Sequence, residues 1–329
     1  MKLKLIIDMK KKNVIVITGP TATGKTALGA RLALTLGGEV VSADSMQIYK
    51  HMDIGTAKPT EEETLGVRHH MLDVVAPWED YSVARYVADA VRCVDDILSR
   101  GMTPVLVGGT GLYIDSLLAG RKFSQRSDNE LRKTLQAEYD NIGGEAMLRK
   151  LHKLDPDSAA KLHANDKKRI VRALEVYNIT GKTISQHDRE TKRLPPRYES
   201  KKIALTFSDR AQLYERIDRR VDRMLSAGLL EEVKNLLEMG VEPGCTAMQA
   251  IGYTEIIGVI FGKNSLETAA QTIKMESRRL AKRQLTWLRR DKDIKWIEPA
   301  QCPLVGLPAG QTGDQWSDLA RTIENWSSA

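Results

Sequence analysis

A glycine-rich run near the amino end constrains this chain more than any other feature. Residues Gly19, Pro20, Thr21, Ala22, Thr23, Gly24, Lys25 and Thr26 match the pattern G-x-x-x-x-G-K-[ST] at every fixed position. The apolar run 14–17 precedes it, and a helix-like run, 27–34, follows it. This succession of strand, loop and helix is typical of a phosphate-binding loop (P-loop), in which backbone amides and a helix N-terminus bind a diphosphate.

Two side chains of the P-loop have expected roles. Lys25 should reach the outer phosphate oxygens, and the hydroxyl of Thr26 should bind a Mg²⁺ ion that bridges them. An ordinary glycine turn is the alternative, and the agreement of the spacing with both flanks disfavours it. The loop does not reveal which diphosphate it holds.

Charge and cysteine content narrow the class of protein. The 329 residues include 50 Lys and Arg against 43 Asp and Glu, an excess that favours a polyanionic partner. Cys93, Cys245 and Cys302 lie far apart, so neither a disulfide framework nor a zinc site is indicated. No apolar run approaches the length of a membrane span or a signal peptide. We therefore expect a cytoplasmic monomer with no membrane partner.

Two further apolar runs end in residues suited to chemistry. The run 38–42 leads into Asp44, and the run 103–107 leads into Gly108, Gly109 and Thr110. Because functional groups of doubly wound sheets lie at the carboxyl ends of strands, Asp44 should face the P-loop, either as a base or as an indirect Mg²⁺ ligand. Asp44 as a turn former and Thr110 as part of a bare turn remain alternatives. A strand ending in glycine rather than Asp argues against a motor-type NTPase.

Strand patterns stop between residues 121 and 200 and resume at 203–207. The intervening helical patterns are basic, with Lys168 and Arg172 on one helix face and Arg169 beside them, while Ile170 and Val171 are expected to pack. A solvated face is the alternative. The predicted fold is α/β, a P-loop doubly wound parallel sheet flanked by helices with a mainly α-helical insertion: core 1–120, insertion 121–200, and core completion with basic C-terminal helices 201–329.

Basic residues also line the helices after the insertion. Arg216, Arg220 and Arg223 share a helix face that suits an anion, although interleaved acidic residues explain part of the pattern. A small loop is expected at residues 249–254. The last helical stretch is basic and includes Trp287, a combination that favours nucleic acid.

Several motifs together resemble the tRNA dimethylallyltransferase family, bacterial type, from about residue 13 to 296. The block from Asp44 to Pro59 is far more specific than the P-loop. The resemblance is carried by residues 19–26, 44–49 (DSMQIY), 52–59 (MDIGTAKP), 108–113 (GGTGLY), 172–176 (RALEV) and 281–284 (AKRQ).

The resemblance implies transfer of a dimethylallyl group from dimethylallyl diphosphate to N6 of the adenosine just 3′ of certain tRNA anticodons. The P-loop would then hold the donor diphosphate, Asp44 would take the N6 proton, and Thr110 and Arg220 would lie by the diphosphate or the reacting centre. The family usually has a basic residue where this chain has Thr254. Residues implied to contact tRNA are Asp44, Ser45, Met46, Gln47, Arg132, Lys168, Arg169, Ile170, Val171, Arg172, Gln249, Ala250, Ile251, Gly252, Tyr253 and Thr254.

Two other functions remain open from the sequence. In a small-molecule or nucleoside kinase, Asp44 would activate a hydroxyl and Thr26 would hold Mg·ATP next to an identical P-loop. In a non-catalytic RNA-binding module, the loop would be a structural relic. The identity of the donor separates these alternatives.

Overall fold

The computed structural model describes residues 13–121 and 128–298. Outside these residues lie Cys302, the start of the predicted core segment 1–120 and the end of the predicted segment 201–329. The chain divides into two compact units. The helical unit is Ala119–Arg197, and the core unit comprises the described residues before and after it.

The core unit is built on a six-stranded parallel sheet with the order β3-β2-β4-β1-β5-β6. The chain winds outward from the central β1 in both directions, so the carboxyl ends of β1, β2 and β4 meet at one edge. This arrangement confirms the predicted α/β fold. The strands are β1 (Asn13–Thr18), β2 (Gly38–Ser42), β3 (His69–His70), β4 (Thr103–Val107), β5 (Glu199–Leu205) and β6 (Ile294–Ile297).

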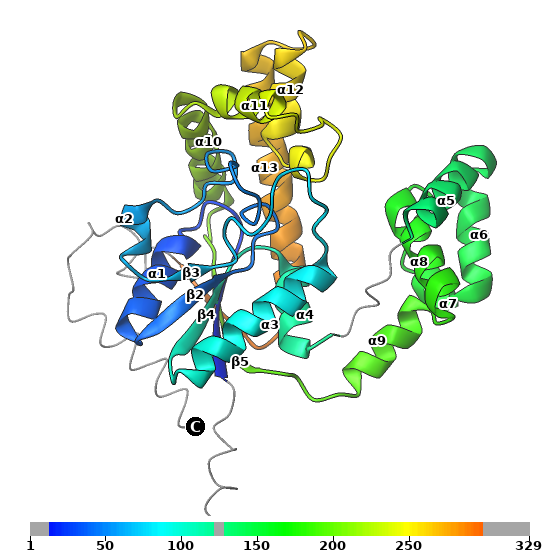
Figure 1. The fold of residues 1–329 in the computed structure, drawn as a ribbon, viewed down its shortest axis with the longest axis horizontal. Helices are drawn as coiled ribbons and strands as arrows, with labels where there is room; N and C mark the ends of the chain where they lie inside the picture. The colour runs from blue at the N-terminus through cyan, green and yellow to red at the C-terminus, as the bar shows by residue number, and fades with distance from the viewer. Residues whose placement is uncertain (1–12, 122–127, 299–329) are drawn as a thin grey trace, which may run out of the picture. The chain divides into compact units, whose positions relative to one another are not determined.

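Helices cover both faces of this sheet (Figure 1). Alternate residues of β1 point to opposite faces, and Ile15 and Ile17 pack with Leu28 and Leu32 of α1 (Lys25–Thr35). On the other face, α3 (Val83–Ser99) and α4 (Gly111–Ala119) pack together through stacked tyrosine rings. Because both faces are buried, the central strands β1 and β4 are largely apolar.

The remaining helices of the core unit gather beyond the carboxyl edge of the sheet, where Figure 1 shows α10 to α12 around α13. The packing of α10 against α13 rests on Leu213, Ile217 and Ala281. No helix among the described residues combines the length and apolar character needed to cross a bilayer. These elements are α10 (Arg210–Ser226), α11 (Leu229–Glu238), the 3₁₀ turn η2 (Ala247–Gln249), α12 (Tyr253–Ile260) and α13 (Leu266–Leu288). The short helix α2 (Glu61–Thr64) lies instead beside α1 (Figure 1).

The helical unit has its own apolar core. Leu135, Met147 and Leu151 pack there against Ile170 and Leu174. Its helices are α5 (Asn129–Ile142), α6 (Gly144–Leu154), α7 (Pro156–Ala159), α8 (Lys167–Thr180) and α9 (Ile184–Lys192).

Candidate active site

The P-loop connects β1 to α1 through backbone that only glycine adopts easily. Gly19 has φ +136°, and a Cβ there would lie 2.4 Å from the carbonyl oxygen of Leu205 in β5. Gly24 is left-handed, with φ +88°, and directly precedes α1. The two glycines therefore let the chain turn tightly between the strand and the helix.

Lys25 closes the loop on itself. Its Nζ donates to the carbonyl oxygen of Pro20 at 2.7 Å, and the Thr23 hydroxyl donates to the same oxygen at 2.9 Å. Burial, together with the positive charge of Arg220, lowers the pKa of Lys25 to about 7, and the Asp44 carboxylate opposes this shift. An anion in the loop would restore the charge on this lysine.

Asp44 and Thr110 come from neighbouring strand ends. The Asp44 Oδ1 accepts from the Met46 amide at 2.9 Å, and the Thr110 Oγ1 accepts from the Ser45 amide at 3.1 Å. A Cβ on Gly108 would lie 2.2 Å from the Ala43 carbonyl oxygen, so glycine allows the two turns to touch. The turn after β2 is thus tied to the turn after β4.

Gln47 is held in a single orientation. Its Oε1 accepts from the Ser42 hydroxyl at 3.1 Å, while its Nε2 donates to the carbonyl oxygens of Thr56 at 3.3 Å and Ala57 at 3.1 Å. These bonds fix which end of the amide is the donor.

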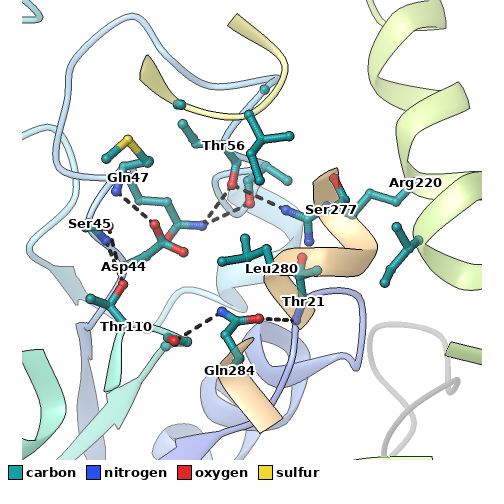
Figure 2. A pocket seen from close by; sticks show the side chains of 18 of the residues that line it. Thr21, Asp44, Ser45, Gln47, Thr56, Thr110, Arg220, Ser277, Leu280 and Gln284 are labelled. Atoms are coloured by element: carbon teal, nitrogen blue, oxygen red, sulfur yellow. Dashed lines mark hydrogen bonds between the residues drawn. The ribbon is translucent and has the colours of Figure 1, made fainter. Parts of the chain in front are cut away.

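These groups face a shared cavity of about 430 Å³, which we call the first cavity. Figure 2 shows Asp44 and Gln47 on one side of it and Arg220 opposite. Lys25, Thr26, Ser45, Met46 and Thr110 also line it. The structure therefore places Asp44, Arg220 and the P-loop residues Lys25 and Thr26 around one space.

A second cavity, of about 740 Å³, lies on the other side of the P-loop lysine. Lys25, Thr26 and Arg220 line both cavities. Arg216 and Arg223 line the second one, and the Arg216 Nε donates to the Ala22 carbonyl oxygen at 2.9 Å. The predicted three-arginine face of α10 is thus turned toward the P-loop.

Part of the first cavity is apolar. Its wall includes Ile217, Val221 and Met224 from α10, with Ile273 and Leu280 from α13. An apolar wall beside phosphate-binding groups suits a ligand that combines a diphosphate with a hydrocarbon group.

Gln284 of α13 belongs to the site, although the sequence predicted no role for it. Its Oε1 accepts from the Thr21 amide at 2.9 Å, and its Nε2 donates to the Gly109 carbonyl oxygen at 3.1 Å (Figure 2). A Cβ on Gly109 would lie 2.2 Å from that Nε2. The adjacent glycines 108 and 109 were the available signal, since they indicate a close approach of another group.

The predicted tRNA-contacting residues of α8 divide by burial. Lys168 and Arg169 are exposed, whereas Ile170 and Val171 lie in the core of the helical unit. The side chains of Ile170 and Val171 are therefore used in packing, and a tRNA contact by these two residues stays a prediction. Arg172 pairs with the buried Glu175 at 2.9 Å, and Arg132 reaches the same carboxylate from α5 at 3.0 Å.

The segment 249–254 is not the small loop that was expected. It contains the end of η2 and the start of α12, and Tyr253 is fully buried, with its hydroxyl donating to Glu232 at 2.6 Å. The Tyr253 side chain is thus committed to Glu232, and a tRNA contact at this residue stays a prediction. Gln249, Ala250 and Ile251 line the first cavity, Gly252 is buried, and Thr254 is exposed.

Comparison with known proteins shows the family of the chain. The chain is 49% identical to a tRNA dimethylallyltransferase of Acetivibrio thermocellus, over 87% of this chain and 91% of the relative. It is 48% identical to that of Carboxydothermus hydrogenoformans, over 87% and 92%.

Solved structures agree as well. A tRNA isopentenylpyrophosphate transferase from Bacillus halodurans superimposes with a TM-score of 0.68 at 39% identity, covering 96% of each chain. A eukaryotic dimethylallyltransferase acting on tRNA gives a TM-score of 0.77 at 31% identity, covering 95% of this chain and 78% of that one. The family described as isopentenyl transferase matches residues 12–76, and the family described as IPP transferase matches residues 47–291. Since the second match spans well over half of the sequence, the chain belongs to the IPP transferase family.

Proposed function

We infer that this protein transfers a dimethylallyl group from dimethylallyl diphosphate to N6 of the adenosine next to the 3′ end of the anticodon in tRNA. The observation that carries this is the shared first cavity, in which the P-loop lysine, the Asp44 carboxylate and an apolar wall meet. A donor with a charged diphosphate and a short hydrocarbon chain needs all three.

The chemistry follows from these groups. The adenosine N6 attacks C1 of the donor, so the N6–C1 bond forms, the C1–O bond breaks and diphosphate leaves. An aromatic amine is a weak nucleophile, and Asp44 assists by accepting its proton. Lys25 and Arg220, which border both cavities, neutralise the charge of the departing diphosphate.

The two cavities explain how the substrates meet. We propose that the donor places its diphosphate at Lys25, Thr26 and Arg220, which line both cavities, and its hydrocarbon chain along the apolar wall of the first cavity, pointing toward Asp44. The adenine, flipped out of its stack, occupies the first cavity. Ser45, Met46 and Gln47 recognise its edge there.

The site offers Mg²⁺ one protein ligand, the Thr26 hydroxyl. Among the described residues there is no group of three or more His, Cys, Asp or Glu side chains arranged to hold a metal. The Thr26 hydroxyl lies beside Lys25, and a Mg²⁺ bound there would take its other ligands from diphosphate oxygens and water, as Mg²⁺ commonly does. When bound, it would supply charge neutralisation for the leaving group.

The RNA contacts are proposed for residues that line the first cavity and for exposed positions. Gln249, Ala250, Ile251 and Thr254 belong to the core unit, near the first cavity. In the helical unit, Lys168 and Arg169 offer exposed cations, while Arg132 and Arg172 are partly neutralised by Glu175. Contacts of this kind make affinity fall with rising salt concentration.

A labelling experiment tests the function and its kinase alternative together. The protein is incubated with an unmodified anticodon stem-loop RNA and either dimethylallyl diphosphate carrying a ¹⁴C label in its carbon chain or γ-³²P-labelled ATP. We expect ¹⁴C in the RNA, located on the target adenosine by nuclease digestion and mass spectrometry. A stem-loop with guanosine at that position is the control. Transfer of ³²P to an acceptor without transfer of ¹⁴C would support a kinase instead.

Donor affinity should depend on pH through Lys25. Its pKa is about 7 in the free protein, and a bound diphosphate raises it. Above pH 7 donor binding therefore takes up a proton, and affinity should fall by up to about tenfold per pH unit between pH 7 and 9. Calorimetric titration with dimethylallyl diphosphate, in the presence of the guanosine-substituted stem-loop, measures the donor affinity and the number of protons taken up on binding.

The matched variant for this measurement is Lys25→Arg. Arginine stays charged throughout this range, so the variant should bind donor with little pH dependence and without proton uptake. An equal pH dependence in both proteins would exclude Lys25 as its source.

A further inference from the structure

The loop of residues 53–57 borders both cavities and is held by one carboxylate. Asp53 and Ile54 line the second cavity, and Gly55 and Thr56 line the first. Glu232, in the first turn of α11, accepts from the backbone amides of residues 53, 54 and 55 at 2.8, 2.7 and 3.1 Å. Three consecutive amides on one carboxylate fix the path of a backbone.

Tyr253 completes this clamp from α12. Its hydroxyl donates to the Glu232 Oε1 at 2.6 Å, and a Cβ on Gly55 would lie 2.4 Å from its ring, so the loop backbone rests on the tyrosine. Burial and the neighbouring carboxylate raise the pKa of Tyr253, which keeps the phenol protonated as a donor. Glu232 thus binds four donors from two segments far apart in the sequence.

The clamped loop in turn orients two side chains of the reaction site. The Thr56 carbonyl oxygen accepts from the Gln47 Nε2 at 3.3 Å and from the Arg220 Nη2 at 3.5 Å. Ala57 provides the second carbonyl for Gln47 at 3.1 Å. A shift of this loop would therefore move a proposed adenine contact and a proposed diphosphate contact together.

We propose that Glu232 is a positioning residue for the transfer reaction, acting through the 53–57 loop on Gln47 and Arg220. It lines neither cavity itself, and Tyr253 supports it. This inference rests on the proposed function for its kinetic readout, because Gln47 and Arg220 are assigned there to adenine and diphosphate. The clamp itself is a property of the loop and can be measured without catalysis.

A double-mutant cycle between Glu232→Ala and Gln47→Ala tests the proposal. Misplacing reacting groups by about 1 Å costs up to about 100-fold, so we expect Glu232→Ala to lower kcat by about 30-fold with KM for the donor changed by less than about threefold. In the Gln47→Ala background the same substitution should lower kcat by only about fivefold, because one of its two targets is gone. Equal losses in both backgrounds would overturn the proposal.

Hydrogen exchange gives a readout that does not depend on activity. The amides of residues 53–55 should exchange slowly in the wild-type protein and at least ~10-fold faster in Glu232→Ala, while β1 amides are unchanged. The control is Glu231→Gln. Glu231 is the neighbour of Glu232 on α11 and pairs with Lys234 at 2.8 Å on the surface, so this variant should change neither kcat nor exchange. Unchanged exchange at residues 53–55 in Glu232→Ala would reject the clamp.

If Glu232→Ala does not fold, a milder variant still tests the proposal. Tyr253→Phe removes one of the four donors and keeps the ring against Gly55, so kcat should fall by about threefold in the wild-type background and by less in Gln47→Ala. The same loss in both backgrounds would contradict the proposal. If the wild-type protein transfers no dimethylallyl group, the proposed function fails, and exchange at residues 53–55 still decides whether the clamp exists.

Discussion

Replacing Asp44 with asparagine should lower kcat by at least about 100-fold while leaving the affinity for tRNA nearly unchanged, as expected for loss of a general base. Asparagine keeps an oxygen that can accept the Met46 amide, now 2.9 Å from Oδ1, so the turn after β2 should persist. The substitution removes proton acceptance, together with the negative charge that opposes the lowered pKa of Lys25. Single-turnover kinetics with saturating donor, and RNA binding followed by filter retention, measure the two effects.

The control for Asp44 is a carboxylate on another surface. Asp96 is exposed on α3 and pairs with Arg100 at 2.9 Å, so Asp96→Asn should leave turnover unchanged. Turnover near the wild-type level in Asp44→Asn would show that another group takes the N6 proton. A parallel loss of RNA affinity and turnover would instead assign Asp44 to binding.

Local sequence patterns predicted the parts of the site that are contiguous in the chain. The P-loop, the turn at Asp44 and the turn at Thr110 each follow an apolar strand, and parallel strands bring their carboxyl ends to one edge. Topology alone therefore places these three segments together. No interaction between distant residues has to be known for this step.

Contacts between distant residues were not accessible to the same reasoning. Gln284 lies 263 residues after its partner Thr21, and Glu232 lies 177 residues after Gly55. Gln284 and Glu232 are ordinary polar residues on helices, and the role of each depends on which distant residues contact it in the folded chain. The same cause explains Tyr253. The segment 249–254 was predicted to be a small loop, whereas Gly252 is the N-cap of α12, and Tyr253, the first residue of that helix, supports Glu232.

Burial also decides between two expectations for α8. Ile170 and Val171 were expected to pack, and the resemblance also placed them among the tRNA contacts. They are 0% and 2% exposed, so their side chains pack in the core, whereas Lys168 and Arg169 are exposed and remain the proposed RNA contacts of this helix. A family motif marks a segment, whereas helix periodicity indicates which of its side chains point outward.

Arg220 is where the two cavities and the clamped loop converge, and its removal should impair use of the donor. Burial lowers the pKa of its guanidinium without discharging it, so it presents a cation beside Lys25. By analogy with the loss of one group that stabilises developing negative charge, Arg220→Ala should lower kcat/KM for dimethylallyl diphosphate by about 100-fold. Affinity for the anticodon stem-loop should change by less than about threefold, because its site is lined mainly by other residues.

Arg219 provides a matched control for this charge, since it precedes Arg220 on α10. It is exposed and pairs with Glu215 at 3.4 Å, so Arg219→Ala removes the same charge from solvent and should leave kcat/KM for the donor unchanged. Arg220→Lys should recover part of the loss, because it restores the charge without the guanidinium contact to Thr56. A change in KM confined to the RNA would place Arg220 with the acceptor, and the charge of the diphosphate would then have to be neutralised without Arg220.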